Sequence, residues 1–384
     1  MSTAERWRVA ARRAGTHSLI FLPLVVVGWA IGVGWRANAL AWDFTHAYLP
    51  AAHAVVHGQS PYALEAIQTE MTFVYPPIAA YLVAPFLILP LSAAQMAASL
   101  LSVAGIAGSL WLLRVRDWRC YAAALLWVSS YAVIHGANLT TLLVLGAAAV
   151  WRWRDRPVVT GMLTGLIVAA KLLAWPLLLF LLVTRRRLAA ATALVAFGAF
   201  LLLPWAAIGF QGLGEYPHLL RLLADAERGD AYTLGALLAP LFGWPAGEAI
   251  AYLVGGLLLL ALLKRRHEEP RAFVLALMAA LVLSPIVWMD YFLFLAIVLG
   301  VTRPRFSVLW LLPIALWFGP QVGNGASWQT AFVLGLVAFV VTRAVSAGAR
   351  ERGPAEREQR REAGAAPSTA LEPPPAATAA TGLV

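Results

Sequence analysis

The chain has 384 residues, of which 61% are hydrophobic and 12% are charged, and its formal net charge is +10. Soluble domains are roughly 45–50% apolar and about 25% charged, so this composition excludes an ordinary soluble protein. The basic residues fall in short arginine-rich clusters between apolar blocks, which is the positive-inside pattern of a multi-pass membrane protein. We therefore expect the lipid bilayer as a partner, no nucleic acid, and a location in a bacterial-type plasma membrane.

The apolar blocks predict an all-α bundle of about twelve transmembrane helices. The first block, 18–36, is too long for a signal peptide and follows a cytoplasmic N-terminus at 1–17. The remaining candidate spans are 77–91 with 93–113, 119–135, 138–151, 157–171, 172–184, 188–208, 248–263, 271–285, 288–302, 307–319 and 328–345. The charge clusters allow one crossing between Pro77 and Arg114, so we expect 77–91 to be re-entrant or interfacial. Together, 18–345 forms the transmembrane domain.

The interval Trp42–Pro77 is the first long polar stretch, and it contains no Lys or Arg. We expect this outer loop, 37–76, to face away from the cytoplasm. Asp43 follows the first span by a few residues, where a carboxylate can meet both a lipid-linked and a water-soluble substrate. The alternative is that Asp43 caps the short helix that follows it.

Aromatic residues surround Asp43 in the sequence, among them Tyr48, Tyr62 and Tyr75. Sugar rings bind through apolar stacking and a few placed polar groups, so these tyrosines are candidate substrate contacts. An ordinary interfacial aromatic belt is the alternative.

Three histidines of the loop, His46, His53 and His57, have spacings that place them on one helical face. Pro50 interrupts that helix and no cysteine is near, so surface or acceptor-contacting histidines are favoured over a zinc site. His46 is kept as a candidate substrate contact. The loop also lacks an Asp-x-Asp pair, and we expect no metal and no cofactor.

Lys171 is the clearest charge inside the apolar region, at the junction of two short segments that predict a broken helix. A cation there costs at least ~2.5–3.5 kcal/mol and usually has a partner, for which a phosphate is suited. Snorkelling to the membrane surface is the alternative. Asp290 is a second such charge, and both Asp290 and the nearby Trp288 are candidate substrate contacts. Asp290 could pair with Lys171, orient a substrate or cap a helix.

Two further regions complete the organisation of the chain. The second outer loop, 209–247, carries mixed charge and suits a solvated edge or an amphipathic helix. The segment 346–384 is rich in Arg, Glu, Ala and Pro and predicts a disordered cytoplasmic tail. We find no tandem repeat, which disfavours an inverted-repeat transporter.

Several short motifs occur together in one order and resemble glycosyltransferase family 87. They are Asp43-Phe44, Gly58-x-x-Pro61-Tyr62, Phe73-x-Tyr75-Pro76-Pro77, Lys171 with Pro176, and Ser284-Pro285-x-x-Trp288. The resemblance implies a polyprenol-phosphate-mannose-dependent α-mannosyltransferase of the C-type membrane glycosyltransferase fold, with Asp43 catalytic and Lys171 embedded in the membrane. Two departures concern the donor pocket. The chain has Gly136-Ala137-Asn138 in place of Gly-Gln, and Asp290 where a His is common.

Residue chemistry leads to the same expectation. A lipid phosphate is a good leaving group, so one base, Asp43, suffices to deprotonate the acceptor hydroxyl, and Lys171 can neutralise the departing phosphate. A glycosidase would need a second carboxylate, for which Glu65 or Glu70 are available. We expect an inverting hexosyltransferase, with mannose the expected sugar, acting on a glycolipid or glycan acceptor outside the cytoplasm. The alternatives are a flippase or transporter of a lipid-linked sugar, and a non-catalytic membrane partner.

Overall fold

The computed structural model describes residues 21–63, 72–319 and 326–364. All regular secondary structure in these ranges is helical. The chain divides into two units, Met1–Val345 and Ser346–Val384. The predicted cytoplasmic N-terminus, 1–17, and both Glu65 and Glu70 lie outside the described residues.

Four helices are long and apolar enough to cross a membrane. They are α4 (Leu91–Leu112), α10 (Arg187–Ala207), α13 (Trp244–Lys264) and the part Ser327–Ser346 of α16 (Ser327–Gly364). A fifth span results if α6 (Val128–Gly136) and α7 (Thr140–Arg152), which are bent by 117° at their junction, count as one broken crossing. The remaining apolar helices are shorter, beginning with Phe21–Arg36. The all-helical membrane architecture is thus present, while the count of twelve stays a prediction.

Several predicted spans are broken in the structure, and prolines account for two of these breaks, those in 77–91 and 307–319. The segment 77–91 forms α3 (Pro77–Val83) and the 3₁₀ helix η3 (Ala84–Ile88), and the next helix begins only after Pro90. The segment 119–135 divides into α5 (Trp118–Leu125) and α6, and 288–302 into η5 (Met289–Leu293) and α15 (Phe294–Thr302). The segment 307–319 forms only the 3₁₀ turns η6 (Val308–Trp310) and η7 (Leu312–Phe318). The segments 119–135, 288–302 and 307–319 are therefore not single straight helices. The segment 77–91 was expected to be re-entrant or interfacial, and that expectation stays a prediction.

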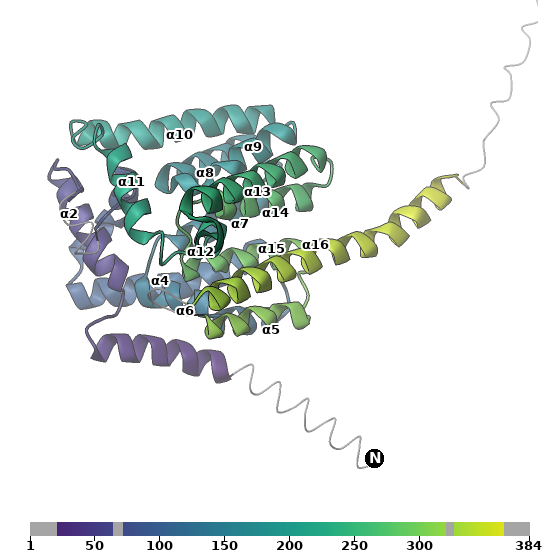
Figure 1. The fold of residues 1–384 in the computed structure, drawn as a ribbon, viewed down its shortest axis with the longest axis horizontal. Helices are drawn as coiled ribbons and strands as arrows, with labels where there is room; N and C mark the ends of the chain where they lie inside the picture. The colour runs from purple at the N-terminus through teal and green to yellow at the C-terminus, as the bar shows by residue number, and fades with distance from the viewer. Residues whose placement is uncertain (1–20, 64–71, 320–325, 365–384) are drawn as a thin grey trace, which may run out of the picture. The chain divides into compact units, whose positions relative to one another are not determined.

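Small residues set the closest helix contacts. Helix α8 (Pro157–Ala170) packs on α10 through Gly161 and Gly165, which lie one turn apart. A Cβ at Gly165 would lie 2.6 Å from the Cβ of Ala196, so only glycine fits there. This is the small-residue packing that membrane helices use in place of a hydrophobic driving force. Figure 1 shows α8, α9 (Pro176–Val183) and α10 side by side, with α13 and α14 (Glu269–Val282) next to them.

Helices α4 and α7 form a second close pair. A Cβ at Gly105 of α4 would lie 2.4 Å from Cγ2 of Thr141 on α7. The amide of Gln95, near the start of α4, donates to Oγ1 of Thr45 in the outer loop at 3.0 Å. The first turns of α4 therefore hold the segment that carries Asp43.

A separate apolar cluster fixes the outer loop to the bundle. It joins Phe44 and Tyr48 of the loop, Val55 of α2 (Leu49–Val56), Trp205 of α10 and Tyr216 of α11 (Tyr216–Glu227). Buried apolar contacts of this kind hold a loop in one place without regular hydrogen bonding to it. The second outer loop, 209–247, is itself largely helical, with α11 and α12 (Leu234–Phe242) inside it.

Helix α16 continues to Gly364, beyond the boundary predicted at 346. The added stretch is rich in Arg, Glu and Ala, which favour helix over coil. Residues 365–384 lie outside the described residues, so the disordered tail stays a prediction for them.

Candidate active site

Asp43 lies inside a helix rather than ahead of one. It precedes the five-residue π-helix η1 (Phe44–Tyr48), has helical φ and ψ of −63° and −41°, and makes no capping hydrogen bond. The capping alternative is therefore wrong. Ala41, with φ of 54°, turns the chain just before it. Single π-turns occur often at functional sites, because they re-aim side chains that a regular α-helix would point elsewhere.

The Asp43 carboxylate rests on the end of α6. A Cβ added to Gly136 would lie 2.9 Å from Oδ2 and 3.1 Å from Cγ of Asp43, so the carboxylate occupies the space that any larger residue would need. The next residue, Ala137, has a left-handed φ of 49° and ends the helix. The chain then turns sharply into α7.

Asn138, in this turn, connects the two acidic residues. Its Nδ2 donates to Oδ2 of Asp290 at 3.1 Å, and its side chain also hydrogen-bonds Asp43. Its Oδ1 accepts from the backbone N–H of Thr140 at 3.1 Å, which directs the amide N–H groups toward the carboxylates. Thr140 Oγ1 donates to Asp290 at 2.5 Å, and Asp290 is only 4% exposed. Both carboxylates are thus held by donors from one short turn.

Lys171 is buried beside these carboxylates. Helix α8 ends at Ala170, Lys171 is extended (φ −151°), and the short helix η4 (Leu172–Ala174) follows, so the break predicted here is present. Its Nζ lies 3.9 Å from the ring centroid of Tyr291, 5.0 Å from that of Tyr75 and 5.8 Å from that of Trp288. The residue is 7% exposed, so its amine does not snorkel to the surface. Its positive charge acts on both Asp43 and Asp290.

These surroundings set the proton affinity of Asp43. Burial, followed by the charge of Asp290, raises its pKa to about 6, while the hydrogen bond from Asn138 and the charges of Lys171 and His46 lower it. A carboxylate with a pKa of about 6 is still mostly ionised at pH 7. It is also a stronger base than an exposed aspartate, which is the condition for general-base catalysis near neutral pH.

The predicted tyrosines divide into two groups. Tyr48 stacks on Tyr75 with ring centroids 5.4 Å apart, and its hydroxyl accepts from the N–H of Leu139 at 3.3 Å. Burial raises the pKa of both phenols, so they stay protonated. Tyr62 lies one shell further out, stacked on Trp205 at 5.4 Å, and its hydroxyl donates to the backbone oxygen of Tyr75 at 2.8 Å. Tyr48 and Tyr75 therefore line the site, and Tyr62 supports it.

The other predicted residues lie at the margin. His46 is exposed, with its ring 3.9 Å from that of Trp42. His53 and His57 contact each other at 4.3 Å between centroids, further along the loop. Trp288 faces Lys171 and donates through Nε1 to Glu227 at 3.3 Å. The roles of Asn138, Thr140, Tyr291 and Glu227 were not predicted.

Membrane-spanning helices and a buried lysine that interacts electrostatically with two carboxylates suit an active site in a membrane enzyme. The family model of Glycosyltransferase family 87 matches residues 73–289, more than half of the chain. The protein is thus a membrane glycosyltransferase. It belongs to glycosyltransferase family 87. Searches of curated proteins and of solved structures give no significant match.

The matched region contains most of the site. It covers Tyr75, Gly136, Asn138, Lys171 and Trp288, and it ends one residue before Asp290. Asp43 precedes it, and contacts within the fold bring it to the same place.

Proposed function

We propose that the protein transfers a hexose, with mannose the expected sugar, from a polyprenyl-phosphate donor to a glycolipid or glycan acceptor. The reaction would take place at the extracytoplasmic surface of a bacterial-type plasma membrane. The observation that carries the proposal is the position of the Asp43 carboxylate, held by Gly136 and Asn138 within the electrostatic reach of Lys171. Membership of the family supports the transferase over the transporter alternative.

In this reaction Asp43 takes the proton of an acceptor hydroxyl as its oxygen attacks the anomeric carbon of the donor. The bond from that carbon to the phosphate oxygen breaks, and the electron pair leaves with the lipid phosphate. Lys171 offsets the negative charge that develops on the phosphate, in a site from which water is largely excluded. A phosphate needs no proton to leave, so no general acid is required. One displacement at carbon inverts the configuration, and a β-linked donor gives an α-glycoside.

The aromatic walls fit a sugar phosphate. Tyr75 presents its ring to Lys171, and Tyr48 stacks on Tyr75. Apolar ring faces next to a few polar groups are the usual surface for a hexose. Asp290, held by Asn138 and Thr140, balances the charge of Lys171 when no phosphate is bound.

Replacing the base tests the proposal. We expect Asp43→Asn to lower transfer from polyprenyl-phosphate-mannose by about 10²–10⁴-fold, the range of general-base catalysis, in purified protein. Asp225→Asn is the matched control, because Asp225 is an exposed carboxylate of the second outer loop. Unchanged transfer by Asp43→Asn would exclude Asp43 as the base. Transport of a lipid-linked sugar without any glycoside product would favour the transporter alternative.

A further inference from the structure

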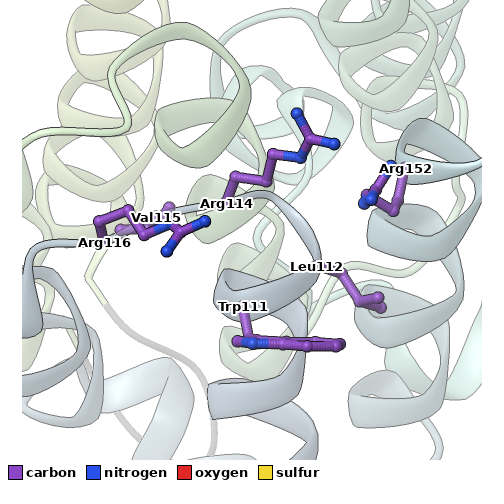
Figure 2. A pocket seen from close by; sticks show the side chains of 6 residues that line it. All are labelled: Trp111, Leu112, Arg114, Val115, Arg116 and Arg152. Carbon is purple, nitrogen blue, oxygen red and sulfur yellow. The ribbon is translucent and has the colours of Figure 1, made fainter.

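Three arginines surround a hollow at the far ends of α4 and α7. Arg114 and Arg116 follow α4, and Arg152 is the last residue of α7. Together with Trp111, Leu112 and Val115 they line a cavity of about 270 Å³. Figure 2 shows Arg114 and Arg116 on the loop after α4, Arg152 on the adjacent helix α7, and the Trp111 ring below them. We name this site the arginine hollow.

The arginine hollow lies at the opposite side of the bundle from the candidate active site. Helix α4 starts beside Thr45 and has 22 residues, which span roughly 33 Å at 1.5 Å per residue. That length is enough to cross a bilayer core, which is about 30 Å thick. Helix α7 runs the same way, from Thr140 at Asp290 to Arg152. The two sites therefore face opposite membrane surfaces.

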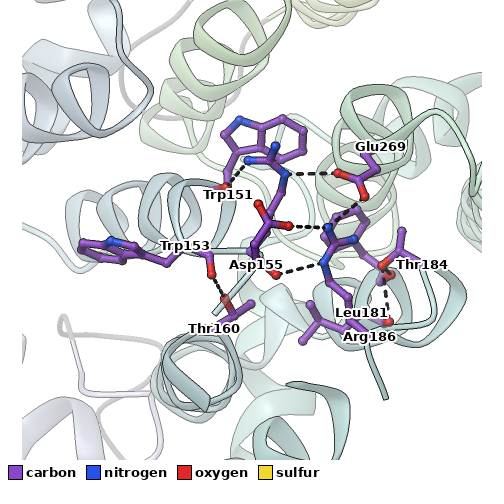
Figure 3. A network of polar contacts seen from close by, with 10 residues as sticks. Trp151, Trp153, Asp155, Thr160, Leu181, Thr184, Arg186 and Glu269 are labelled. Atoms are coloured by element: carbon purple, nitrogen blue, oxygen red, sulfur yellow. Dashed lines mark hydrogen bonds and ion pairs between the residues drawn. The ribbon is translucent and has the colours of Figure 1, made fainter. Parts of the chain in front are cut away.

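The arginines of the hollow have no carboxylate partner among the residues that the structure describes. None of the three forms an ion pair with Asp or Glu within the described ranges 21–63, 72–319 and 326–364. A neighbouring site on the same side of the bundle differs. There Arg186 pairs with Asp155 at 3.2 Å and with Glu269 at 2.8 Å (Figure 3), and Arg154 pairs with Glu269 at 3.1 Å. Two carboxylates offset part of the positive charge at that site, whereas no carboxylate of the described chain lines the hollow.

Arg114 has a backbone conformation that is unfavourable for residues other than glycine. Arg114 has φ of 60°, in the left-handed turn that closes α4, where glycine is the favoured residue. The turn is held by a hydrogen bond from the N–H of Val115 to the oxygen of Leu110 at 3.0 Å. Arginine at this position, where glycine would be unstrained, places a long cationic side chain at the hollow.

An apolar stripe on α4 leads to the hollow from within the membrane. Leu101, Ala104 and Trp111 are exposed at helical spacing on one face, and Trp111 is 71% exposed. A tryptophan at the end of a spanning helix marks the level of lipid headgroups. An acyl chain can lie along this stripe while its phosphate meets the arginines. The volume is slightly below the ~300 Å³ at which pockets for drug-sized ligands begin, and it suits a headgroup.

We propose that the arginine hollow binds the phosphate of an anionic phospholipid at the membrane surface opposite the active site. Arginine binds phosphate oxygens through paired N–H donors, and basic pockets between helices hold anionic headgroups. The site is separate from the donor site, which faces the other leaflet in the proposed function. The inference depends on the spanning fold and the hollow, not on the transfer chemistry.

Lipid retention by the purified full-length protein tests this proposal. The protein is reconstituted in phosphatidylcholine vesicles with and without phosphatidylglycerol, extracted, and its bound lipid is counted by native mass spectrometry. We expect the wild type to retain phosphatidylglycerol selectively. The double variant Arg114→Gln/Arg152→Gln should retain at least about tenfold less, because each basic residue near the surface contributes several-fold to affinity for anionic lipid.

Arg185→Gln is the matched control. Arg185 also has a left-handed φ of 61°, but it lines the neighbouring cavity that contains Asp155 and Glu269. It should keep the selectivity of the wild type, and thermal unfolding checks that each variant is folded. Equal retention by the double variant and the control would overturn the proposal. A second outcome would also overturn it: inorganic phosphate raises the unfolding temperature of the wild type, but the protein does not retain phosphatidylglycerol selectively. The site would then hold a free anion and not a lipid.

Discussion

The two ends of helix α7 handle charge in opposite ways. At its start, Thr140 and the preceding Asn138 donate to the buried carboxylate of Asp290, and Asn138 also hydrogen-bonds the half-buried Asp43. Lys171 lies beside them among aromatic rings. At its end, 13 residues or roughly 20 Å away, Arg152 joins two other arginines around an open hollow. One end brings charges of both signs together, and the other has charges of one sign only.

Each end of α7 is suited to a different task. A buried charge needs partners, and those partners also fix its position, as catalysis requires. Exposed arginines at a membrane surface need no such partners, because water and lipid phosphates solvate them. Changes at the start of α7 should therefore alter the rate of transfer, whereas changes at its end should alter lipid binding.

The largest effect after loss of Asp43 should come from Lys171→Met. This change keeps the length of the buried side chain and removes the only lysine charge at the site. We expect a fall of about 10²–10³-fold in kcat/KM for the polyprenyl-phosphate donor, the scale of losing one preorganised charge at a reacting group. Initial rates at varied donor concentration measure it. Lys264→Met, at the last residue of α13, should leave the rate unchanged, and equal rates for both variants would refute the role of Lys171.

A smaller effect should follow from Gly136→Ala. The added methyl would lie 2.9 Å from Oδ2 of Asp43, so the carboxylate has to move by several tenths of an ångström. Misplacement on this scale can reduce turnover by up to about 10²-fold. Gly198→Ala on α10 is the control, because a Cβ there meets nothing within 4 Å. Transfer assays on both variants, with unfolding temperatures, separate a positioning effect from loss of stability. Full activity of Gly136→Ala would show that the position of the Asp43 carboxylate against Gly136 does not matter for transfer.

Asn138→Ala should have the smallest effect on rate and a diagnostic effect on pH dependence. The Asn138 hydrogen bond stabilises the ionised form of Asp43, so its removal raises the pKa of that carboxylate. We expect about a tenfold loss of the transfer rate near neutral pH, in line with the loss of a hydrogen bond to a charged group. The acid limb of the pH–rate profile, where the rate falls as Asp43 is protonated, should shift toward higher pH. Gln329→Ala, a half-buried amide near the start of α16 that donates to the backbone of Phe318, should leave the pH dependence as in the wild type. If Asn138→Ala shows the same pH dependence of the transfer rate as the wild type, Asn138 does not act through the pKa of Asp43.

The sequence alone predicted the charged members of the site and the helical membrane class. Asp43 stood out in a loop without Lys or Arg, and Lys171 stood out within an apolar block, because charges are costly there. Their proximity was not predictable, since it depends on where α8 breaks and on how the outer loop folds back onto the bundle. The role of Lys171 at the site, like that of Asp43, stays a prediction.

The sequence did not predict the supporting contacts. Gly136 and Asn138 were noted only as a departure from a family motif, and their closeness to Asp43 joins positions more than ninety residues apart. Span boundaries also failed where prolines divide apolar blocks into 3₁₀ turns, as at Pro313. Hydropathy measures how apolar a segment is, and it does not show whether the segment is one straight helix.

The pH dependence of kcat/KM for transfer tests most directly whether Asp43 is the base. If it is, the rate follows the ionised fraction of a carboxylate with a pKa of about 6. The rate should then be level near pH 8 and fall about tenfold per unit as the pH drops below 6. The residual activity of Asp43→Asn should lack this limb. A wild-type rate that stays level from about pH 8 down to about pH 5, or the same limb in Asp43→Asn, would contradict the account.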